Sequence, residues 1–187
     1  MNSWIILGII GVIVALFVIL YNRLVALRQT RNNAFSDIDV QLKQRFNLVP
    51  QLVETVKGYA KHEKEVFENV TNARSRVGAA KGATGERVAA ENVLGGALMG
   101  LLAVAEAYPD LKADQNFQKL MSELSDIENK IAAARRFFNN ATAEYNTATE
   151  QFPAVLIAGS FGFSKEEFFE LDATEAAAVQ KPPEVKF

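Results

Sequence analysis

The feature that constrains this chain most is an uninterrupted apolar run near its start. Residues 4–20 contain no charged and no amide side chain. An α-helix rises about 1.5 Å per residue and a bilayer core is about 30 Å thick, so about 17–25 apolar residues can cross it. Trp4 and Tyr21 bracket the run, as aromatic side chains do at membrane–water interfaces. We therefore predict a transmembrane anchor over residues 1–21, whose membrane-facing residues include Trp4, Leu7, Ile10, Val14, Phe17, Leu20 and Tyr21.

The residues that flank this run indicate how it is used. Only residues 1–3 precede it, so it lacks the basic start of a secretory signal peptide, and no Ala-x-Ala cleavage pattern follows. We expect an uncleaved single-pass anchor. Arg23, Arg28 and Arg31 follow the run, and basic flanks favour the cytoplasmic side, so we expect a cytoplasmic C-terminal domain.

Composition limits what the remaining chain can do. The 187 residues suffice for one domain with a core, and 20 Lys and Arg against 22 Asp and Glu give a net charge of −2. This balance argues against nucleic-acid binding, which uses clustered excess basic charge. The absence of cysteine excludes disulfides and thiolate metal sites.

A helical period begins after the anchor. In a heptad frame through Phe35 and Ile38, eleven of thirteen core positions up to Val77 are apolar, the exceptions being Arg45 and Glu63. Such heptads are typical of coiled coils, but further apolar residues beside the stripe widen it and favour a bundle core. Two interpretations of Pro50 stay open: a kink in one continuous helix, or a turn that separates two helices.

Two further helices are predicted. After a loop marked by Gly78, Gly82 and Gly85, the second runs from about Glu86 to Tyr108 and ends before Pro109. Its uncharged stretch, residues 92–105, is too short to span a bilayer and indicates a buried core helix. Gly96 and Gly100 have the spacing of a membrane-helix dimer motif, but we expect them to admit another helix of the same chain.

The third helix has the clearest pattern. It starts near Asp114, covers about 36 residues and stops before Pro153, and all eleven positions of its frame from Phe117 to Phe152 are apolar. Its polar residues include a dense group that we interpret as an interhelical network: Glu128, Arg135, Arg136, Asn139 and Asn140.

The segment after Pro153 is too apolar for a free tail. Five of the thirteen Phe residues lie between Phe152 and Phe169, and we predict a lid that packs on the bundle. Ser164 and Glu167 have capping-box spacing, which predicts a short helix over residues 165–171. The helical domain with its lid thus covers 22–171, and 172–187 is a mobile tail. Candidate interaction residues are Phe35, Phe46, Phe161, Phe163, Phe168 and Phe169.

Residues for familiar chemistry are missing from the sequence. His62 is the only histidine, and Val66 stands where a zinc-protease helix needs its second one. The glycine loop lacks the Gly-Lys-Ser/Thr end of a phosphate loop. Four carboxylates could gather a hard cation but suit a solvated face: Asp37, Asp39, Glu54 and Glu63. We therefore predict no catalytic residues, no cofactor and no metal, and a protein that is not an enzyme.

Several ordered blocks together resemble the LemA family, over about residues 21–171. They are Tyr21–Val25, Phe35–Lys43, Leu48–Ala60, Ala105–Leu111, Glu128–Ile131, Ala134–Asn139, Tyr145–Asn146 and Gln151–Pro153. Phe35 departs from the family pattern, which usually has Trp there. The resemblance implies a bacterial single-pass protein of the inner membrane, with an antiparallel bundle of about four helices. It implies no established enzymatic activity and no catalytic residues.

The interpretation that follows is an all-α protein, with an N-terminal transmembrane helix and then a helical bundle, that acts as a scaffold or protein-interaction module. The alternatives are an accessory or regulatory subunit of a membrane protease or envelope-stress system, and a cation-dependent sensor or hydrolase. We expect the lipid bilayer as a partner, a homo-oligomer because the anchor concentrates identical chains, and possible contacts with other membrane proteins.

Overall fold

All regular secondary structure in the part that the computed structural model describes, residues 2–80 and 85–169, is helical, and no strand occurs there. This confirms the predicted all-α class, with a long apolar helix at the N-terminus followed by a bundle. The elements are α1 (Asn2–Tyr59), α2 (Lys64–Ala79), α3 (Gly85–Glu106), α4 (Pro109–Ala113), α5 (Gln115–Glu150), α6 (Val155–Ala158) and the 3-10 helix η1 (Gly159–Phe161). The predicted mobile tail, residues 172–187, and part of the predicted glycine loop lie outside the described residues.

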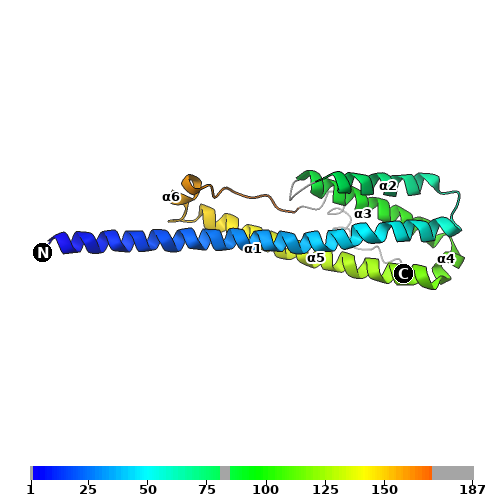
Figure 1. Ribbon diagram of the computed structural model, residues 1–187, viewed down its shortest axis with the longest axis horizontal. Coiled ribbons are helices and arrows are strands. Elements are labelled where there is room, and N and C mark those ends of the chain that lie inside the picture. Colours follow the sequence, from blue (N-terminus) through cyan, green and yellow to red (C-terminus); the bar gives the residue numbers. More distant parts are fainter. Residues whose placement is uncertain (1, 81–84, 170–187) are drawn as a thin grey trace, which may run out of the picture. The chain divides into compact units, whose positions relative to one another are not determined.

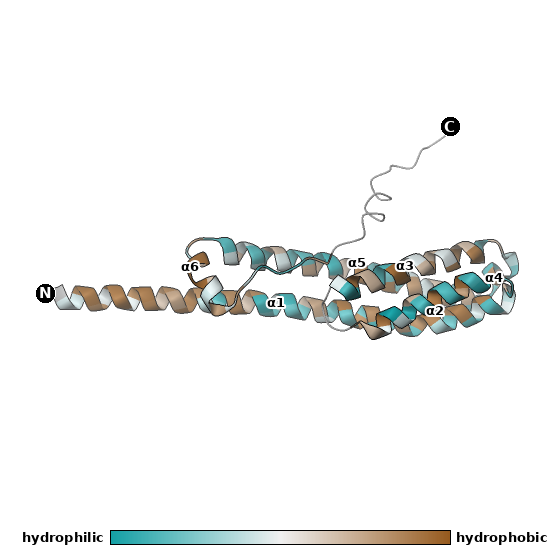
Figure 2. Ribbon diagram, turned by 90° about the horizontal axis from the view of Figure 1, so that it is seen from above, coloured by the Kyte–Doolittle hydropathy of each residue, from teal (hydrophilic) through white to brown (hydrophobic). Residues whose placement is uncertain are grey.

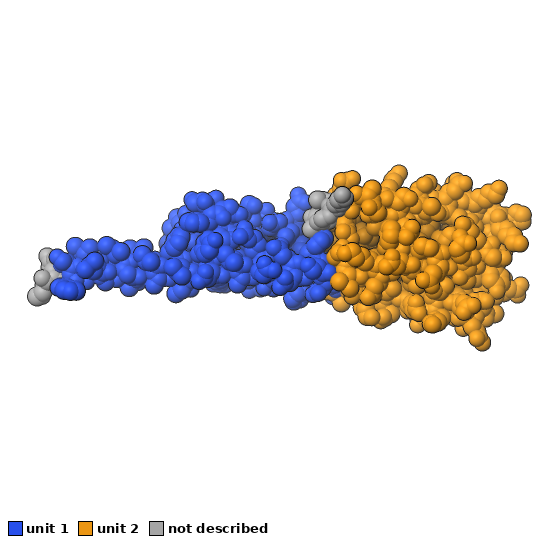
Figure 3. All heavy atoms as spheres, viewed as in Figure 1, with its two compact units in different colours: residues 1–38, 134–168 blue, residues 39–133, 169–187 orange. Residues whose placement is uncertain are grey.

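The chain forms two compact units, shown in different colours in Figure 3. Unit 1 comprises residues 1–38 and 134–168, and unit 2 comprises residues 39–133 and 169–187. Both α1 and α5 contribute residues to each unit, because each helix continues across the division.

Unit 2 is a helical bundle built from the end of α1, from α2 and α3, and from the start of α5, with the short α4 between α3 and α5. Its core is aliphatic and follows the heptad positions of the sequence. Fully buried side chains come from each of these helices: Leu42, Leu52 and Val56 of α1, Val70 of α2, Leu94 and Leu101 of α3, Leu111 of α4 and Ile131 of α5.

Pro50 lies inside α1, which continues through it, so the interpretation of Pro50 as a dividing turn is wrong. A proline in a helix cannot donate to the carbonyl four residues earlier, here that of Phe46. Arg74 of α2 supplies the missing donor, because its Nε lies 3.1 Å from the Phe46 carbonyl oxygen. The Arg74 guanidinium also lies over the Phe46 ring, 3.9 Å from the ring centroid. The neighbouring helix thus compensates for the hydrogen bond that Pro50 removes.

The division between α1 and α2 falls at residues 60–63, where the heptad pattern predicted continuous helix. Tyr59, a frame position, is exposed there rather than buried, and its hydroxyl donates to Oδ2 of Asp114 at 3.0 Å. Oδ1 of Asp114 accepts the Phe117 backbone N–H at 2.8 Å and so caps the start of α5. Hydrogen bonds from the Phe117 backbone and the Tyr59 hydroxyl hold the pKa of Asp114 below its ordinary value.

Unit 1 pairs the first part of α1 with the last part of α5 and adds the chain after Pro153. Its core contains residues from all three: Leu24, Tyr145, Ala148, Ala154, Ala158 and Phe163. The backbone turns after η1 at Gly162, whose positive φ of 71° favours glycine. The Phe163 N–H reaches the Ala158 carbonyl at 2.9 Å, the bond that closes a Schellman turn and directs the Phe163 ring inward.

The predicted helix over residues 165–171 is wrong for residues 165–169, which form no regular element, and residues 170–171 lie outside the described part. The reason is Asn146 of α5. Its amide nitrogen donates to the Glu166 carbonyl oxygen and its amide oxygen accepts the Glu166 N–H, both at 2.9 Å. A side chain thus satisfies the backbone groups that a helix would otherwise pair.

The N-terminal part of α1 is exposed along its apolar length up to Leu16. Figure 2 shows the hydrophobic colour of this part of the helix. By length and composition, α1 is a candidate membrane span, and α3 passes the same test. The two differ in setting, because the apolar window of α1 has no buried residue whereas a third of that of α3 is buried. Phe17, Leu20 and Tyr21, at the end of the apolar run, are half-buried within unit 1.

Two adjacent phenylalanines of α5 allow a matched stability test. Phe138 is 3% exposed and its ring meets Phe35 edge-to-face at 5.8 Å, whereas Phe137 is 53% exposed. We expect Phe138→Ala to lower the free energy of unfolding by about 3–5 kcal/mol, because it removes buried surface and leaves a cavity. Phe137→Ala serves as the control and should change it by under about 1 kcal/mol. Denaturant unfolding of the full chain in detergent measures both, and equal losses would contradict the assigned core face.

Candidate functional site

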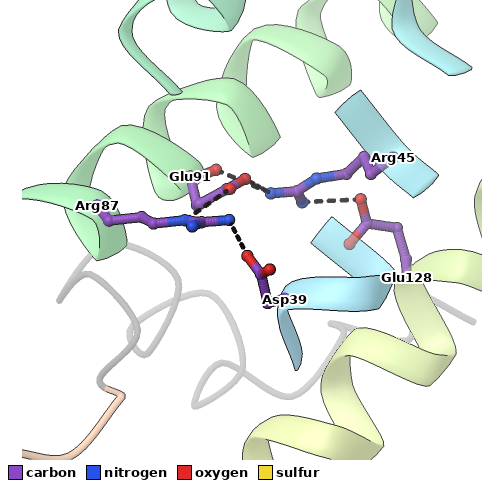
Figure 4. Close-up of polar contacts among 5 residues, drawn as sticks. All are labelled: Asp39, Arg45, Arg87, Glu91 and Glu128. Atoms are coloured by element: carbon purple, nitrogen blue, oxygen red, sulfur yellow. Dashed lines mark hydrogen bonds and ion pairs between the residues drawn. The ribbon is translucent and has the colours of Figure 1, made fainter. Parts of the chain in front are cut away.

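A guanidinium group lies inside the apolar core of unit 2. Arg45 of α1 is 5% exposed and occupies a heptad position that neighbouring turns fill with aliphatic side chains. Its Nη2 lies 2.7 Å from Oε2 of Glu91 and 3.2 Å from the Glu91 carbonyl oxygen. Its Nη1 donates to Oε1 of Glu128 at 2.9 Å. Figure 4 shows how this one side chain joins α1, α3 and α5.

The network continues from Glu91 to a second arginine. Nε of Arg87, one turn earlier on α3, lies 3.7 Å from Oε1 of Glu91, and Nη2 of Arg87 donates to Oδ1 of Asp39 on α1. Oδ2 of Asp39 also pairs with Nζ of Lys43 at 2.8 Å. The charged groups therefore alternate in sign across the α1–α3 contact.

The electrostatics of the cluster favour the charged forms of Arg45 and Asp39. Burial by itself lowers the pKa of Arg45, but its interactions with Glu128 and Glu91 outweigh burial and raise that pKa above its ordinary value. Partial burial likewise raises the pKa of Asp39, but Lys43 and Arg87 outweigh it and hold that pKa below its ordinary value. Arg45 and Asp39 therefore stay charged over the usual pH range.

This geometry suits a structural clamp better than a metal site. Each carboxylate of the cluster faces a guanidinium group, which occupies the position that a cation would take. Across residues 2–80 and 85–169, no group of three or more His, Asp or Glu side chains is arranged to hold a metal ion. The carboxylates considered from sequence are not gathered, since Asp39 pairs with Arg87, Glu54 with Lys57, and Glu63 with Tyr108.

A second buried arginine organises unit 1. Arg31 of α1 is 8% exposed, and its Nε donates to Oγ1 of Thr142 on α5 at 3.2 Å. Its Nη2 pairs with the Glu166 carboxylate at 3.2 Å and donates to the Glu167 carbonyl oxygen at 3.3 Å. Arg31 therefore fastens the C-terminal segment to α1 and α5.

Comparison with known proteins places the chain in a family. The sequence model of the LemA family matches residues 34–187, which is most of the chain. The chain belongs to the LemA family. The resemblance drawn from the ordered sequence blocks is therefore confirmed.

Relatives of this LemA-family chain include magnetosome proteins. It is 26% identical to the magnetosome protein MamQ of Magnetospirillum gryphiswaldense over 174 residues, 80% of this chain and 64% of that protein. It is 25% identical to MamQ 2 of Paramagnetospirillum magneticum, over 84% of this chain and 67% of that protein. Protein LemA of Metamycoplasma hominis is 25% identical over 76% of this chain and 65% of its own length. The chain thus spans about two thirds of the length of these relatives.

The interaction residues predicted for this LemA-family chain fall into two groups. Phe163 and Phe169 are buried, and Phe35 and Phe46 are half-buried against Phe138 and Arg74. Phe161 and Phe168 are 47% and 40% exposed, and so retain surface that a partner can reach. A role of these side chains in partner binding stays a prediction.

Gly96 and Gly100 of α3 do not lie at a helix contact within the described part of the chain, although their spacing predicts one. A Cβ added at Gly96 or Gly100 would meet nothing within 4 Å among the described residues. The expectation that another helix of the same chain approaches these two glycines is therefore wrong. They lie on an exposed, uncharged face of α3 that we call the α3 face, made of Val93, Gly96, Met99, Gly100 and Ala103.

The role of the Arg45 network can be tested by removing the charge and then its partner. We expect Arg45→Met to lower the free energy of unfolding by about 3–5 kcal/mol, because it removes the nearer of the two cations that pair with the buried Glu91 carboxylate. Arg45→Met combined with Glu91→Met should recover most of that loss. Lys43→Met is the control, since this exposed ion pair contributes about 0–1 kcal/mol. A double variant as unstable as the single one would show that the stranded charge is not the cause.

Proposed function

We propose that this protein is a non-catalytic scaffold, anchored in the inner membrane with its bundle in the cytoplasm, that self-associates through the α3 face. Its support begins with α1, which runs as one helix from the candidate membrane span to core positions of the bundle. The arginine networks supply rigidity rather than reactive groups, because their charges are paired with one another.

The observation that carries the proposal is that α3 is apolar on its exposed side as well as on its buried side. Leu94, Leu98 and Leu101 are buried in the core of unit 2, as a bundle helix requires. The opposite side is also apolar, with Val93 43% and Met99 67% exposed, and residues 92–105 carry no charge. A surface helix ordinarily places polar residues outward. An exposed apolar face of this kind commonly marks a protein interface.

A second copy of the chain is the partner that this face suits. A two-fold contact sets each face against itself, and an uncharged face does so without like-charge repulsion. Gly96 and Gly100 lie one turn apart, so two such helices can approach closely at their bare backbones. Anchoring in one membrane raises the effective concentration of the copies. A different membrane protein with an apolar helix is the alternative partner.

Self-association is tested by blocking the close approach. We expect Gly96→Leu with Gly100→Leu to reduce the protein to a single 20.6 kDa chain. The same change should raise bundle stability, because leucine has a higher helix propensity than glycine by about 0.5–1 kcal/mol per site. Light scattering in detergent, corrected for bound detergent, measures the mass, and Gly58→Leu on α1 serves as the matched control. A monomeric unmodified protein at micromolar concentration would contradict self-association.

Orientation is tested with single cysteines, since the natural chain has none. Lys61→Cys places a thiol at an exposed position between α1 and α2, and Ser3→Cys places one before the span. In intact cells we expect a membrane-impermeant thiol reagent to label Ser3→Cys and to leave Lys61→Cys unlabelled until the cells are opened. The reverse pattern would show that the bundle lies outside the cytoplasm.

A further inference from the structure

The chain between α5 and Phe163 has an unusual distribution of side chains. Two small residues, Ala154 just before α6 and Ala158 at its end, are buried in the core of unit 1, at 7% and 4% exposed. The large residues of this segment face outward: Phe152 is 79%, Leu156 69% and Phe161 47% exposed. A segment folded against water would show the opposite pattern, because burial of large apolar side chains drives packing.

This segment contacts α1 where the apolar run ends, and α6 lies beside that part of α1 in Figures 1 and 2. The Phe161 ring meets Phe17 edge-to-face at 5.3 Å and Tyr21 at 5.6 Å. Phe163 comes next along α1, 5.6 Å from Tyr21 and under the Arg28 guanidinium at 4.6 Å. All of these aromatic contacts lie within unit 1, so the segment and the candidate span belong to the same compact unit.

The level of these contacts corresponds to the edge of a bilayer. If Trp4 and Tyr21 mark the two interfaces, the helix between them rises about 25 Å, close to the thickness of a hydrocarbon core of about 30 Å. Phe17 and Tyr21 therefore lie within or at the boundary of the hydrocarbon, and Phe161, which touches both, lies at the same depth. A paired charge comes after this level on α1, since Arg31, ten residues beyond Tyr21, lies 3.2 Å from the Glu166 carboxylate.

We propose that residues 152–161 form a second membrane contact, which inserts its outward apolar side chains into the interfacial layer of the bilayer that the anchor crosses. The proposal rests on the anchor of the proposed function and adds a lipid-binding surface near the other end of the chain. Outward apolar side chains with charged groups behind them are the arrangement of interfacial membrane segments. The occupant of the exposed face is then lipid, because the face is continuous with the lipid-facing surface of α1.

Tryptophan quenching by brominated lipids tests this contact in the full-length protein. Trp4 is the only tryptophan, so Trp4→Phe provides a silent background. Into it we place Leu156→Trp as the reporter and Phe137→Trp as the control, both at exposed positions of unit 1. The neighbour of Phe137, Phe138, contacts Phe35, about 21 Å along α1 beyond Tyr21. The unmodified protein reports on the anchor through Trp4. All are reconstituted in phosphatidylcholine vesicles with bromines at defined acyl depths.

We expect Leu156→Trp to show blue-shifted emission and quenching several-fold stronger than Phe137→Trp, greatest with bromines near the headgroups. Quenching of Trp4 with no more quenching of Leu156→Trp than of Phe137→Trp would overturn the second contact and leave the anchor standing. Absence of quenching at all positions would overturn both. Equal quenching of Leu156→Trp and Phe137→Trp would also overturn the proposal, because lipid contact would not be confined to residues 152–161.

Discussion

A buried positive charge fixes the arrangement of the bundle more strictly than its aliphatic core can. Leucine and valine side chains tolerate small shifts of one helix along another, because apolar contacts are not directional. The Arg45 guanidinium does not, since it needs an oxygen of α3 and an oxygen of α5 within hydrogen-bond distance at once. Sliding α3 or α5 along α1 by one helical turn, about 5.4 Å, would take Glu91 or Glu128 out of hydrogen-bond distance of this guanidinium. The ion pairs thus select the packing that the aliphatic residues then stabilise.

Each unit contains a buried arginine that pairs with oxygens of other segments. Arg31 lies two heptads before Arg45 on α1, at the equivalent position of the apolar stripe. Arg45 selects helix partners, whereas Arg31 selects the path of the returning chain through Glu166 and Glu167. In both cases the fork of the guanidinium group matches several oxygens at fixed angles, which a lysine could not do as well. One helix therefore carries the reference points for the packing of both units.

Helix bounds that depend on the apolar period could be predicted from the sequence. Features that depend on a side chain of another helix could not. The bounds of α5 followed from its apolar frame, with Asp114 at its start and Pro153 beyond its end. The register across Pro50 favoured one continuous helix but left a dividing turn open. The donor that replaces the lost hydrogen bond to the Phe46 carbonyl, Arg74, lies on another helix. The turn at residues 60–63 keeps the heptad spacing and so left no periodic signal. The helix expected after Ser164 failed because Asn146, 20 residues away, pairs with the Glu166 backbone.

The candidate site was visible in part. Arg45 stood out as a charge in a core position, and Glu128 belonged to a polar group already interpreted as interhelical. Glu91 gave no such signal, because it precedes the uncharged stretch and looks like an ordinary solvent-facing residue near the start of α3. Pairing Arg45 with Glu91 requires knowing which turns of α1 and α3 meet, and periodicity within one helix cannot supply this. The wrong expectation for Gly96 and Gly100 has the same cause. Their spacing shows that they share a face of α3, but it does not show whether that face points into the bundle or to solvent.

Because α1 is continuous from Phe17 to Leu24, the number of residues between its contacts fixes both their spacing along the helix and the side of the helix on which they lie. Phe17 and Tyr21 contact the segment after α6, while Leu24 contacts Tyr145 and its neighbours in the core of unit 1. One residue added between Tyr21 and Leu24 would rotate the preceding turns by about 100° and move them by about 1.5 Å. The two sets of contacts could then no longer be made on the same side of the helix. In this stretch the number of residues is therefore a stricter requirement than their identity.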